Sequence, residues 1–106
     1  MKFIVKEPGK KAKIIEYEDT VDTYNVLKSA VGGYIELVYV NGLPKNIDMF
    51  CNETGKLNNL APNINIGYDV VVGTVIFARH NRDGDTIGLT DSDIADIEDF
   101  CNSHSI

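Results

Sequence analysis

The stretch VGGYIELVYVNGLPKNIDMFCNE, residues 31–53, decides the fold that the sequence predicts. Residues 35–40 alternate between two sets of mostly β-branched, aromatic or aliphatic side chains, which predicts a strand in the centre of a sheet. The pair Asn41-Gly42 tolerates positive φ and predicts a turn that folds the chain back antiparallel. The return strand is expected over residues 47–51, and Pro44 favours a connection longer than two residues.

The length and charge of the chain limit its function. At 106 residues it is expected to form one domain, residues 1–106, that buries about two thirds of the surface of its unfolded form. Sixteen acidic residues outweigh ten basic ones, and the net charge of −6 argues against sequence-independent binding to nucleic acid or to an anionic membrane. No apolar run is long enough to span a bilayer, and the first residues lack the apolar segment of a secretory signal. Two cysteines without any other sign of a disulfide framework also fit the cytoplasm, which is the expected compartment.

Two elements are predicted before the central strand. Residues 2–6 and 13–17 are expected to form a hairpin around a Pro-Gly turn. Thr20 is expected to cap a helix whose apolar residues recur at helical spacing, and Gly32 to end that helix in a left-handed conformation. Gly33 then lets the chain turn into the central strand.

The second half of the chain shows three more patterns. The Asn-rich residues 58–67 indicate an ordered loop, and residues 69–79 indicate a second long strand in which Gly73 marks a bulge or a close backbone approach. Residues 86–89 predict a short strand, after which Thr90 caps a last helix. Residues 102–106 are expected to be a frayed tail.

These elements predict an α+β fold: a mainly antiparallel mixed sheet of about five to six strands with two amphipathic helices packed on it. The further hypothesis is that residues 34–40 and 70–77 lie side by side inside this sheet. The surrounding loops would then converge on one pocket.

No pattern for catalysis or metal binding is complete. Residues 81–85 resemble part of a calcium loop, but Arg79 and Thr90 stand where its acidic ligands belong. The two cysteines and two histidines lack the paired spacing of a zinc site, and both cysteines are expected in the core. Cys51 with His80 as nucleophile and base lacks a third, orienting group. We therefore predict no catalytic residue, no metal and no cofactor.

Several short motifs, taken together in their order and spacing, resemble a known family. They are KEPGK at 6–10, VGGYIE at 31–36, CNETGKL at 51–57, APN at 61–63, DVVVGT at 69–74 and LTDSDI at 89–94. The family is an uncharacterised group of small domains carried by bacteriophages, plasmids and conjugative elements, mostly of Gram-positive bacteria. It has no assigned activity, so the resemblance implies a context only: an accessory protein in the cytoplasm of the host bacterium.

Accessory proteins of such elements often counter host defence, and this analogy gives the leading hypothesis. The protein is expected to be a non-enzymatic homo-oligomer that sequesters a small nucleotide-like ligand at a cleft between subunits. Lysines would hold its anionic groups, Tyr34, Tyr39 and Tyr68 would stack on its base, and asparagines would bind its polar edges. The expected ligand-binding residues are Lys6, Lys10, Lys11, Gly32, Gly33, Tyr34, Asn52, Glu53, Asn58, Asn59 and Asn63.

Each of these groups also has a purely structural interpretation. Lysines blunt the edges of sheets, tyrosines on strands pack, and asparagines in loops form turns. The alternative function is that of an acidic, DNA-mimicking inhibitor that docks on a basic host defence protein through Asp91, Asp93, Asp96 and Asp99. Aspartates in the first turn of a helix also stabilise the helix by themselves.

Overall fold

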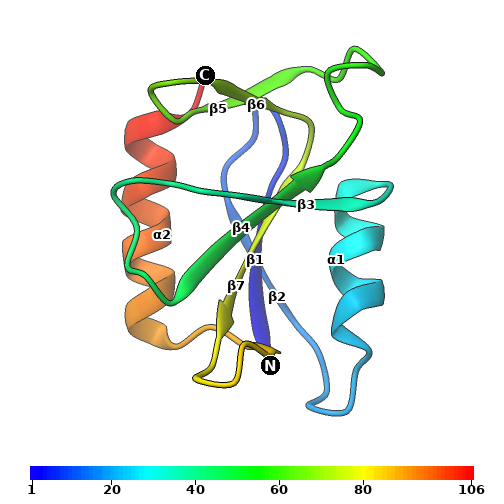
Figure 1. Ribbon diagram of the computed structural model, residues 1–106. Helices are drawn as coiled ribbons and strands as arrows, with labels where there is room; N and C mark the ends of the chain where they lie inside the picture. Colours follow the sequence, from blue (N-terminus) through cyan, green and yellow to red (C-terminus); the bar gives the residue numbers. More distant parts are fainter.

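The computed structural model describes residues 1–106 and confirms the α+β fold (Figure 1). In chain order the elements are β1 (Lys2–Lys6), β2 (Lys13–Glu16), α1 (Thr23–Val31), β3 (Ile35–Val38), β4 (Ile47–Asn52), β5 (Pro62–Asn65), β6 (Val70–Val72), β7 (Val75–His80), β8 (Thr86–Ile87) and α2 (Asp91–His104). The two helices cover opposite faces of one sheet, and the hairpin β5–β6 lies across one end of it. Neither helix has the length and apolar character needed to cross a membrane.

The main sheet is antiparallel, with strand order β2-β1-β7-β4-β3 and with β8 paired to β7. Strand β3 pairs only with β4 and therefore lies at the rim. The hypothesis that residues 34–40 and 70–77 are neighbouring inner strands is wrong. β3 carries apolar residues on both of its faces, which is the pattern expected of a central strand that is buried on both sides. However, one face of β3 lines a groove, while Leu37 and Tyr39 on the other are 59% and 74% exposed.

Residues 69–79 form two strands and not the single long strand that their composition predicts. Gly73 separates β6 from β7 with φ +77°, a left-handed conformation that only glycine adopts without strain. β6 leaves the main sheet and pairs with β5, while β7 continues between β1 and β4. Gly73 thus joins the small hairpin to the central strand of the main sheet.

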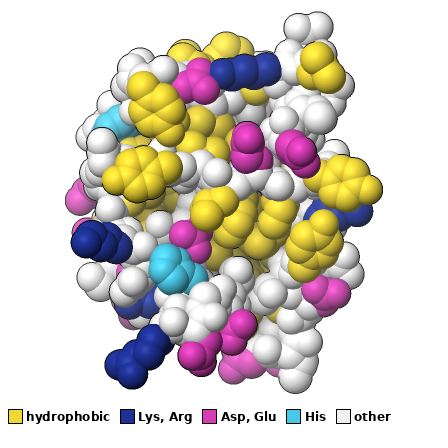
Figure 2. All heavy atoms as spheres, in the orientation of Figure 1, with side chains coloured by type: hydrophobic (Ala, Val, Ile, Leu, Met, Phe, Trp, Pro, Cys, Tyr) yellow, Lys and Arg dark blue, Asp and Glu magenta, His cyan; other side chains and the backbone are white.

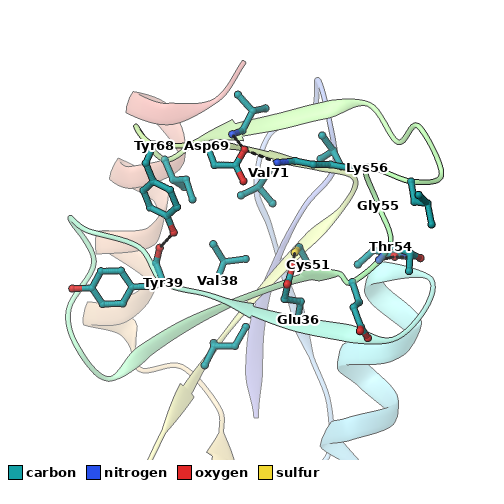
Figure 3. Close-up of a pocket in the computed structure, with 17 residues that line it drawn as sticks. Glu36, Val38, Tyr39, Cys51, Thr54, Gly55, Lys56, Tyr68, Asp69 and Val71 are labelled. Atoms are coloured by element: carbon teal, nitrogen blue, oxygen red, sulfur yellow. Dashed lines mark hydrogen bonds and ion pairs between the residues drawn. The ribbon is translucent and has the colours of Figure 1, made fainter.

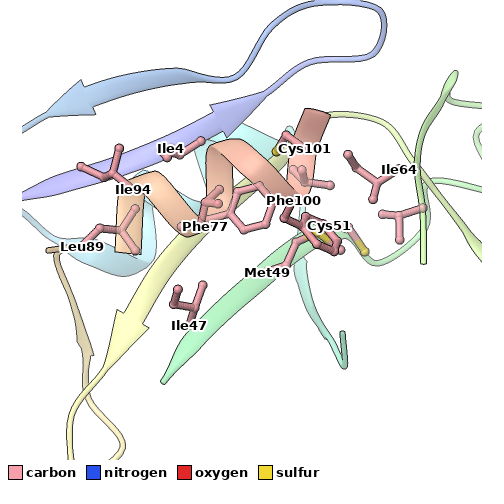
Figure 4. Close-up of a cluster of buried hydrophobic side chains, with 13 residues drawn as sticks. Ile4, Ile47, Met49, Cys51, Ile64, Phe77, Leu89, Ile94, Phe100 and Cys101 are labelled. Atoms are coloured by element: carbon pink, nitrogen blue, oxygen red, sulfur yellow. The ribbon is translucent and has the colours of Figure 1, made fainter. Parts of the chain in front are cut away.

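The larger part of the core lies between the sheet and α2 (Figure 4). Ile94, Ile97 and Phe100 form the buried stripe of α2, as the helical spacing predicts. Phe100 packs edge-on against Phe77 of β7, with ring centroids 6.3 Å apart. Thr90 caps the helix as predicted, and its hydroxyl and the carboxylate of Asp93 form a reciprocal capping box.

The other face of the sheet is covered by α1. Val26, Leu27 and Val31 pack on a second cluster that includes Phe50 and Ile76. Gly32 ends the helix at φ +77°, as predicted. Its N-cap is Asp22 and not Thr20, because the Asp22 carboxylate accepts the N–H of Asn25 three residues later.

The end of the chain is held in place. Helix α2 continues to His104, Ser105 forms a bridge with Ile64, and the N–H of Ile106 donates to the carbonyl of Asn63 at 2.9 Å. The prediction of a frayed tail is therefore wrong. The ordered loop predicted over residues 58–67 does contain ordered backbone, but its second half is strand β5. Both predicted hairpins, β1–β2 and β3–β4, are confirmed.

Candidate functional site

A groove of about 570 Å³ lies between strand β3 and the hairpin β5–β6 (Figure 3). Helix α2 covers β1 and β7 but not β3, so this part of the sheet face is left open. Both strands that border the groove are edge strands: β3 pairs only with β4, and β6 only with β5. Their backbone groups on the groove side are therefore free of ladder partners, and they can give a ligand directional hydrogen bonds.

The floor of the groove is mostly apolar. Val38 of β3, Val71 of β6 and Cys51 of β4 contribute to it. One charged group lies among them: the carboxylate of Glu36, on β3, accepts a hydrogen bond from the Cys51 thiol at 3.7 Å. An apolar floor with one polar anchor is typical of a small-molecule site.

The Cys51 thiol is not an activated nucleophile. Burial, the negative charge of Glu36 and the hydrogen bond to Glu36 together raise the pKa of this thiol to about 11, with burial as the largest cause. Reactivity of cysteine depends on the thiolate, which is scarce at such a pKa. His80 does not approach this thiol, because its side chain is on the α1 face of the sheet, where it bonds to Asp48 at 2.9 Å. The geometry thus provides no cysteine–histidine pair.

Two polar contacts border the groove. At one end the Tyr68 hydroxyl donates to the Tyr39 carbonyl at 2.8 Å. Along the hairpin side the ammonium of Lys56 pairs with the carboxylate of Asp69 at 2.5 Å. The Lys56 hydrogen bond, with a further one from the Val70 backbone, lowers the pKa of Asp69. These contacts tie the hairpin β5–β6 to β3 and to the loop after β4.

The charge in the groove is acidic. Glu36, Glu53 and Asp69 contribute three carboxylates, and Lys56 contributes the one ammonium, which Asp69 already pairs. The formal balance is therefore −2. Figure 2 shows hydrophobic side chains gathered over this face, with acidic side chains among them. Large exposed hydrophobic residues on or beside the groove are Tyr34, Leu37, Tyr39, Leu57 and Tyr68.

The predicted ligand-binding residues fall into two separate groups. One group surrounds Asn52 at the end of β4. The Asn52 amide donates to the Val31 carbonyl at 3.1 Å, and its oxygen accepts from the N–H and hydroxyl of Thr54. Gly33 packs so closely on this amide that an added Cβ would lie 2.8 Å from Nδ2. Within this group only Asn52 and Glu53 border the groove.

The other predicted ligand-binding residues near Asn52 lie outside the groove. Tyr34 accepts the N–H of Glu53 with its carbonyl at 2.9 Å, while its ring is exposed and lies under the ammonium of Lys28. Asn58 bonds to the Thr54 hydroxyl at 3.0 Å, and Asn59 adopts φ +56° in the following turn. Gly32, Asn58 and Asn59 thus shape the chain around the site.

The second group consists of the lysines and Asn63. Lys6 is 3% exposed, and its ammonium donates to the carbonyl of Glu7 and to the side-chain oxygen of Asn63, both at 2.9 Å. Lys10 and Lys11 border a smaller hollow beside Lys6, at the end of α2. No lysine of this group faces the groove between β3 and β6.

The four aspartates of the predicted partner-binding face are not equivalent. Asp91, Asp96 and Asp99 are exposed on α2. Asp93 is buried, and the guanidinium of Arg79 donates to both of its oxygens at 2.7 and 3.0 Å. Burial opposes ionisation of Asp93, but hydrogen bonds from Thr90 and Arg79 outweigh it and lower the pKa of the carboxyl. Asp93 therefore stabilises the fold and is not part of the exposed face.

The residues that sequence reasoning missed are Glu36, Val38, Lys56, Asp69 and Val71, which line the groove. Their spacing carries no signal, because two hairpins distant in sequence bring them together. Alternation places Glu36 and Val38 on one face of β3, but it does not say that α2 leaves this face open. No three His, Cys, Asp or Glu side chains gather closely enough to hold a metal ion.

Comparison with known proteins gives one match. The family model described as Domain of unknown function (DUF3846) matches residues 1–102. The match spans both walls of the groove and the whole main sheet. No curated protein matches the chain, and no solved structure does. The chain therefore belongs to the family Domain of unknown function (DUF3846).

Proposed function

We propose that the protein is a non-enzymatic binding protein that sequesters a small ligand in the groove between β3 and β6. The observation that carries the proposal is the groove itself: about 570 Å³, an apolar floor, one carboxylate at its centre and two free strand edges as walls. Sites for small molecules have volumes of roughly 300–1,000 Å³ and this combination of apolar surface with few polar groups.

The lining of the groove favours one class of ligand. A planar ring fits between its apolar floor and the ring of Tyr68, and ring N–H or amino groups would donate to the carboxylate of Glu36. A formal balance of −2 repels phosphate, and Lys56 is already paired. We therefore narrow the proposed nucleotide-like ligand to one whose neutral or cationic base enters the groove, with any phosphate outside it.

The resemblance in sequence supplies the biological part of the proposal. Small domains of mobile elements often act against host defence, and sequestration of a signal molecule suits a protein without an activated nucleophile. We propose that this protein is an accessory product of a bacteriophage, plasmid or conjugative element that acts in the bacterial cytoplasm. Its role would be to withdraw a nucleotide-like signal from the host.

Calorimetry tests the binding step. Nucleobases, nucleosides and nucleotides are titrated into the protein and into Glu36→Gln, with Glu16→Gln as the matched control. Glu16 is an exposed glutamate on the opposite edge strand, β2, and does not border the groove. We expect Glu36→Gln to weaken binding of a base about tenfold, the value of one charge-assisted hydrogen bond, and Glu16→Gln to bind like the wild type.

Two results would contradict the proposal. One is the lack of heat with every compound of the panel, and the other is an equal effect of both glutamine variants. Chromatography of the ligand after incubation with the protein tests whether the protein is an enzyme, since a ligand that is only sequestered is recovered unchanged. Any turnover that is lost in Glu36→Gln would show that the groove is an active site.

Self-association is part of the proposal. The free edge of β3 and its exposed side chains, Leu37 at 59% and Tyr39 at 74%, favour contact with a second copy. Sedimentation of Leu37→Glu tests this contact, and Ile14→Glu is the control, because Ile14 is 50% exposed on the other edge strand. Only Leu37→Glu is expected to dissociate the oligomer. A wild-type protein that sediments as a monomer would contradict this part.

A second candidate function rests on the exposed face of α2. Asp91, Asp96 and Asp99 give this face a negative charge that suits a basic partner protein. The double reversal Asp96→Lys with Asp99→Lys, compared with Asp83→Lys and Asp85→Lys in the exposed turn before β8, tests it. An inhibitor would lose salt-sensitive binding to a host protein only with the helix variant. Equal binding by both variants would exclude this function.

A further inference from the structure

Another hollow, of about 270 Å³, lies beside Lys6 and apart from the groove. It is bordered by the turn between β1 and β2 and by the last turn of α2. Lys6, Lys10 and Lys11 line it, and no aspartate or glutamate side chain does. It shares no lining residue with the groove.

The ammonium of Lys6 is the unusual group in this hollow. Lys6 is 3% exposed, and both acceptors of its ammonium, the carbonyl of Glu7 and the amide oxygen of Asn63, are neutral. No carboxylate, that of the last residue included, lies within 4.0 Å of it. A buried charge with neutral partners alone is costly, and lysines are seldom fully buried without a counter-charge.

Three features of the chain offset part of this charge. Glu7 pairs with Lys10 at 3.6 Å, so it compensates one lysine. The end of α2 contributes about half an elementary negative charge, although Cys101 and Phe100 already use their carbonyls to accept hydrogen bonds from Ser105 and His104. The third feature is the terminal carboxylate of Ile106, a residue that also borders the hollow. Lys11 has no carboxylate within 4.0 Å, and the charges of Lys6 and Lys11 together exceed the single charge of this carboxylate.

The hollow also offers backbone donors. Lys11 and Ala12 precede β2, and their N–H groups have no hydrogen-bond partner in the chain. Successive free N–H groups beside ammonium groups are the donors that bind oxyanions in proteins. We propose that this hollow binds a small oxyanion of the phosphate type, as inorganic phosphate or as the phosphate of a phosphomonoester. This site is independent of the groove and of the ligand proposed for it.

Amide chemical shifts of the ¹⁵N-labelled protein test the site. Inorganic phosphate and glycerol phosphate are titrated at constant ionic strength against sodium chloride. We expect saturable shifts at Gly9, Lys11, Asn102 and Ser105, with a dissociation constant on the order of 1 mM. The midpoint of thermal unfolding should rise by about 5 °C at ten times that constant, because the anion binds the folded state alone.

Charge-removing variants separate a built site from general attraction to lysines. Lys11→Gln should weaken phosphate binding at least fivefold, while Lys45→Gln, an exposed lysine in the loop before β4, should leave it unchanged. Lys6→Met should abolish binding; if this variant does not fold, Lys11→Gln decides. Shifts with one of the two phosphates alone identify the source of the anion and support the site. Equal shifts with chloride, no shifts, or equal effects of the two glutamine variants would overturn it.

Discussion

Asn63 and Lys6 bind each other in both directions. The Asn63 amide donates to the Lys6 carbonyl at 2.8 Å, and its oxygen accepts from the Lys6 ammonium at 2.9 Å. A second N–H of the same amide donates to the Gly73 carbonyl at 2.8 Å. One fully buried side chain thus joins β5 to β1 and to the bend between β6 and β7. It is a tether for the hairpin that forms one wall of the groove.

Asn63→Ala is expected to lower the free energy of unfolding by about 3 kcal/mol, because two buried carbonyls lose this donor and the buried Lys6 ammonium keeps only the Glu7 carbonyl as acceptor. Urea denaturation followed by circular dichroism measures the loss. Asn65→Ala is the control, since this exposed side chain in the same strand bonds only the N–H of Gly67 and should cost less than about 1 kcal/mol. Equal losses of unfolding free energy in the two variants would show that the hydrogen bonds of Asn63 stabilise the fold no more than that of Asn65.

Asp93→Asn is expected to destabilise the protein by about 2 kcal/mol at neutral pH, less than a fully buried pair because Arg79 is 28% exposed. The lowered pKa of Asp93 means that its contribution is present above about pH 4 and is lost as the pH falls through the pKa of the folded state. The difference between variant and wild type should therefore shrink in acid. Denaturation curves at neutral pH and in acid, below about pH 4, test this, with the exposed Asp96→Asn as the control. If the difference in stability between Asp93→Asn and the wild type is the same at both pH values, the lowered pKa of Asp93 does not contribute to stability.

The Cys51 thiol should react slowly with disulfide reagents, since at a pKa of about 11 only about 10⁻⁴ of it is ionised at pH 7. In a Cys101→Ser background, which leaves Cys51 as the one thiol, Glu36→Gln should speed the reaction several-fold, because it removes a negative charge and an acceptor. Burial remains, so the pKa should still lie above its ordinary value of 9.0. The rate measured against pH reports the shift, and an unchanged profile would show that Glu36 does not act on this thiol.

Gly73→Ala is expected to cost about 2 kcal/mol. Its left-handed backbone disfavours any side chain, and an added Cβ would lie 2.7 Å from Leu60 Cδ1. Gly67→Ala isolates the backbone effect, since Gly67 also has positive φ but nothing lies within 4 Å of its added Cβ; it should cost about 1 kcal/mol. Thermal unfolding compares the two. Equal costs would show that Leu60 rotates away freely.

The sequence by itself determined the local elements. Thr90 with Asp93 specifies where α2 begins, Gly32 specifies where α1 ends, and alternation with turn residues specifies the hairpins β1–β2 and β3–β4. These signals involve residues a few positions apart, so they act before any tertiary contact forms. The N-cap of α1 is Asp22 and not Thr20. Both side chains can accept a backbone N–H and they lie two residues apart, so the local sequence does not decide between them.

Only the tertiary structure decided the neighbours of each strand and the place of the groove. The apolar faces of residues 35–40 fit an inner strand as well as the wall of a groove. In the structure β7 pairs with β4, and not with β3 as the sequence pattern suggested. Lys6 and Asn63 are polar in sequence, yet they are buried because their hydrogen bonds are completed by groups distant in the chain. Periodicity describes which residues share a face, whereas burial depends on what covers that face, and this is settled by contacts between residues far apart in sequence.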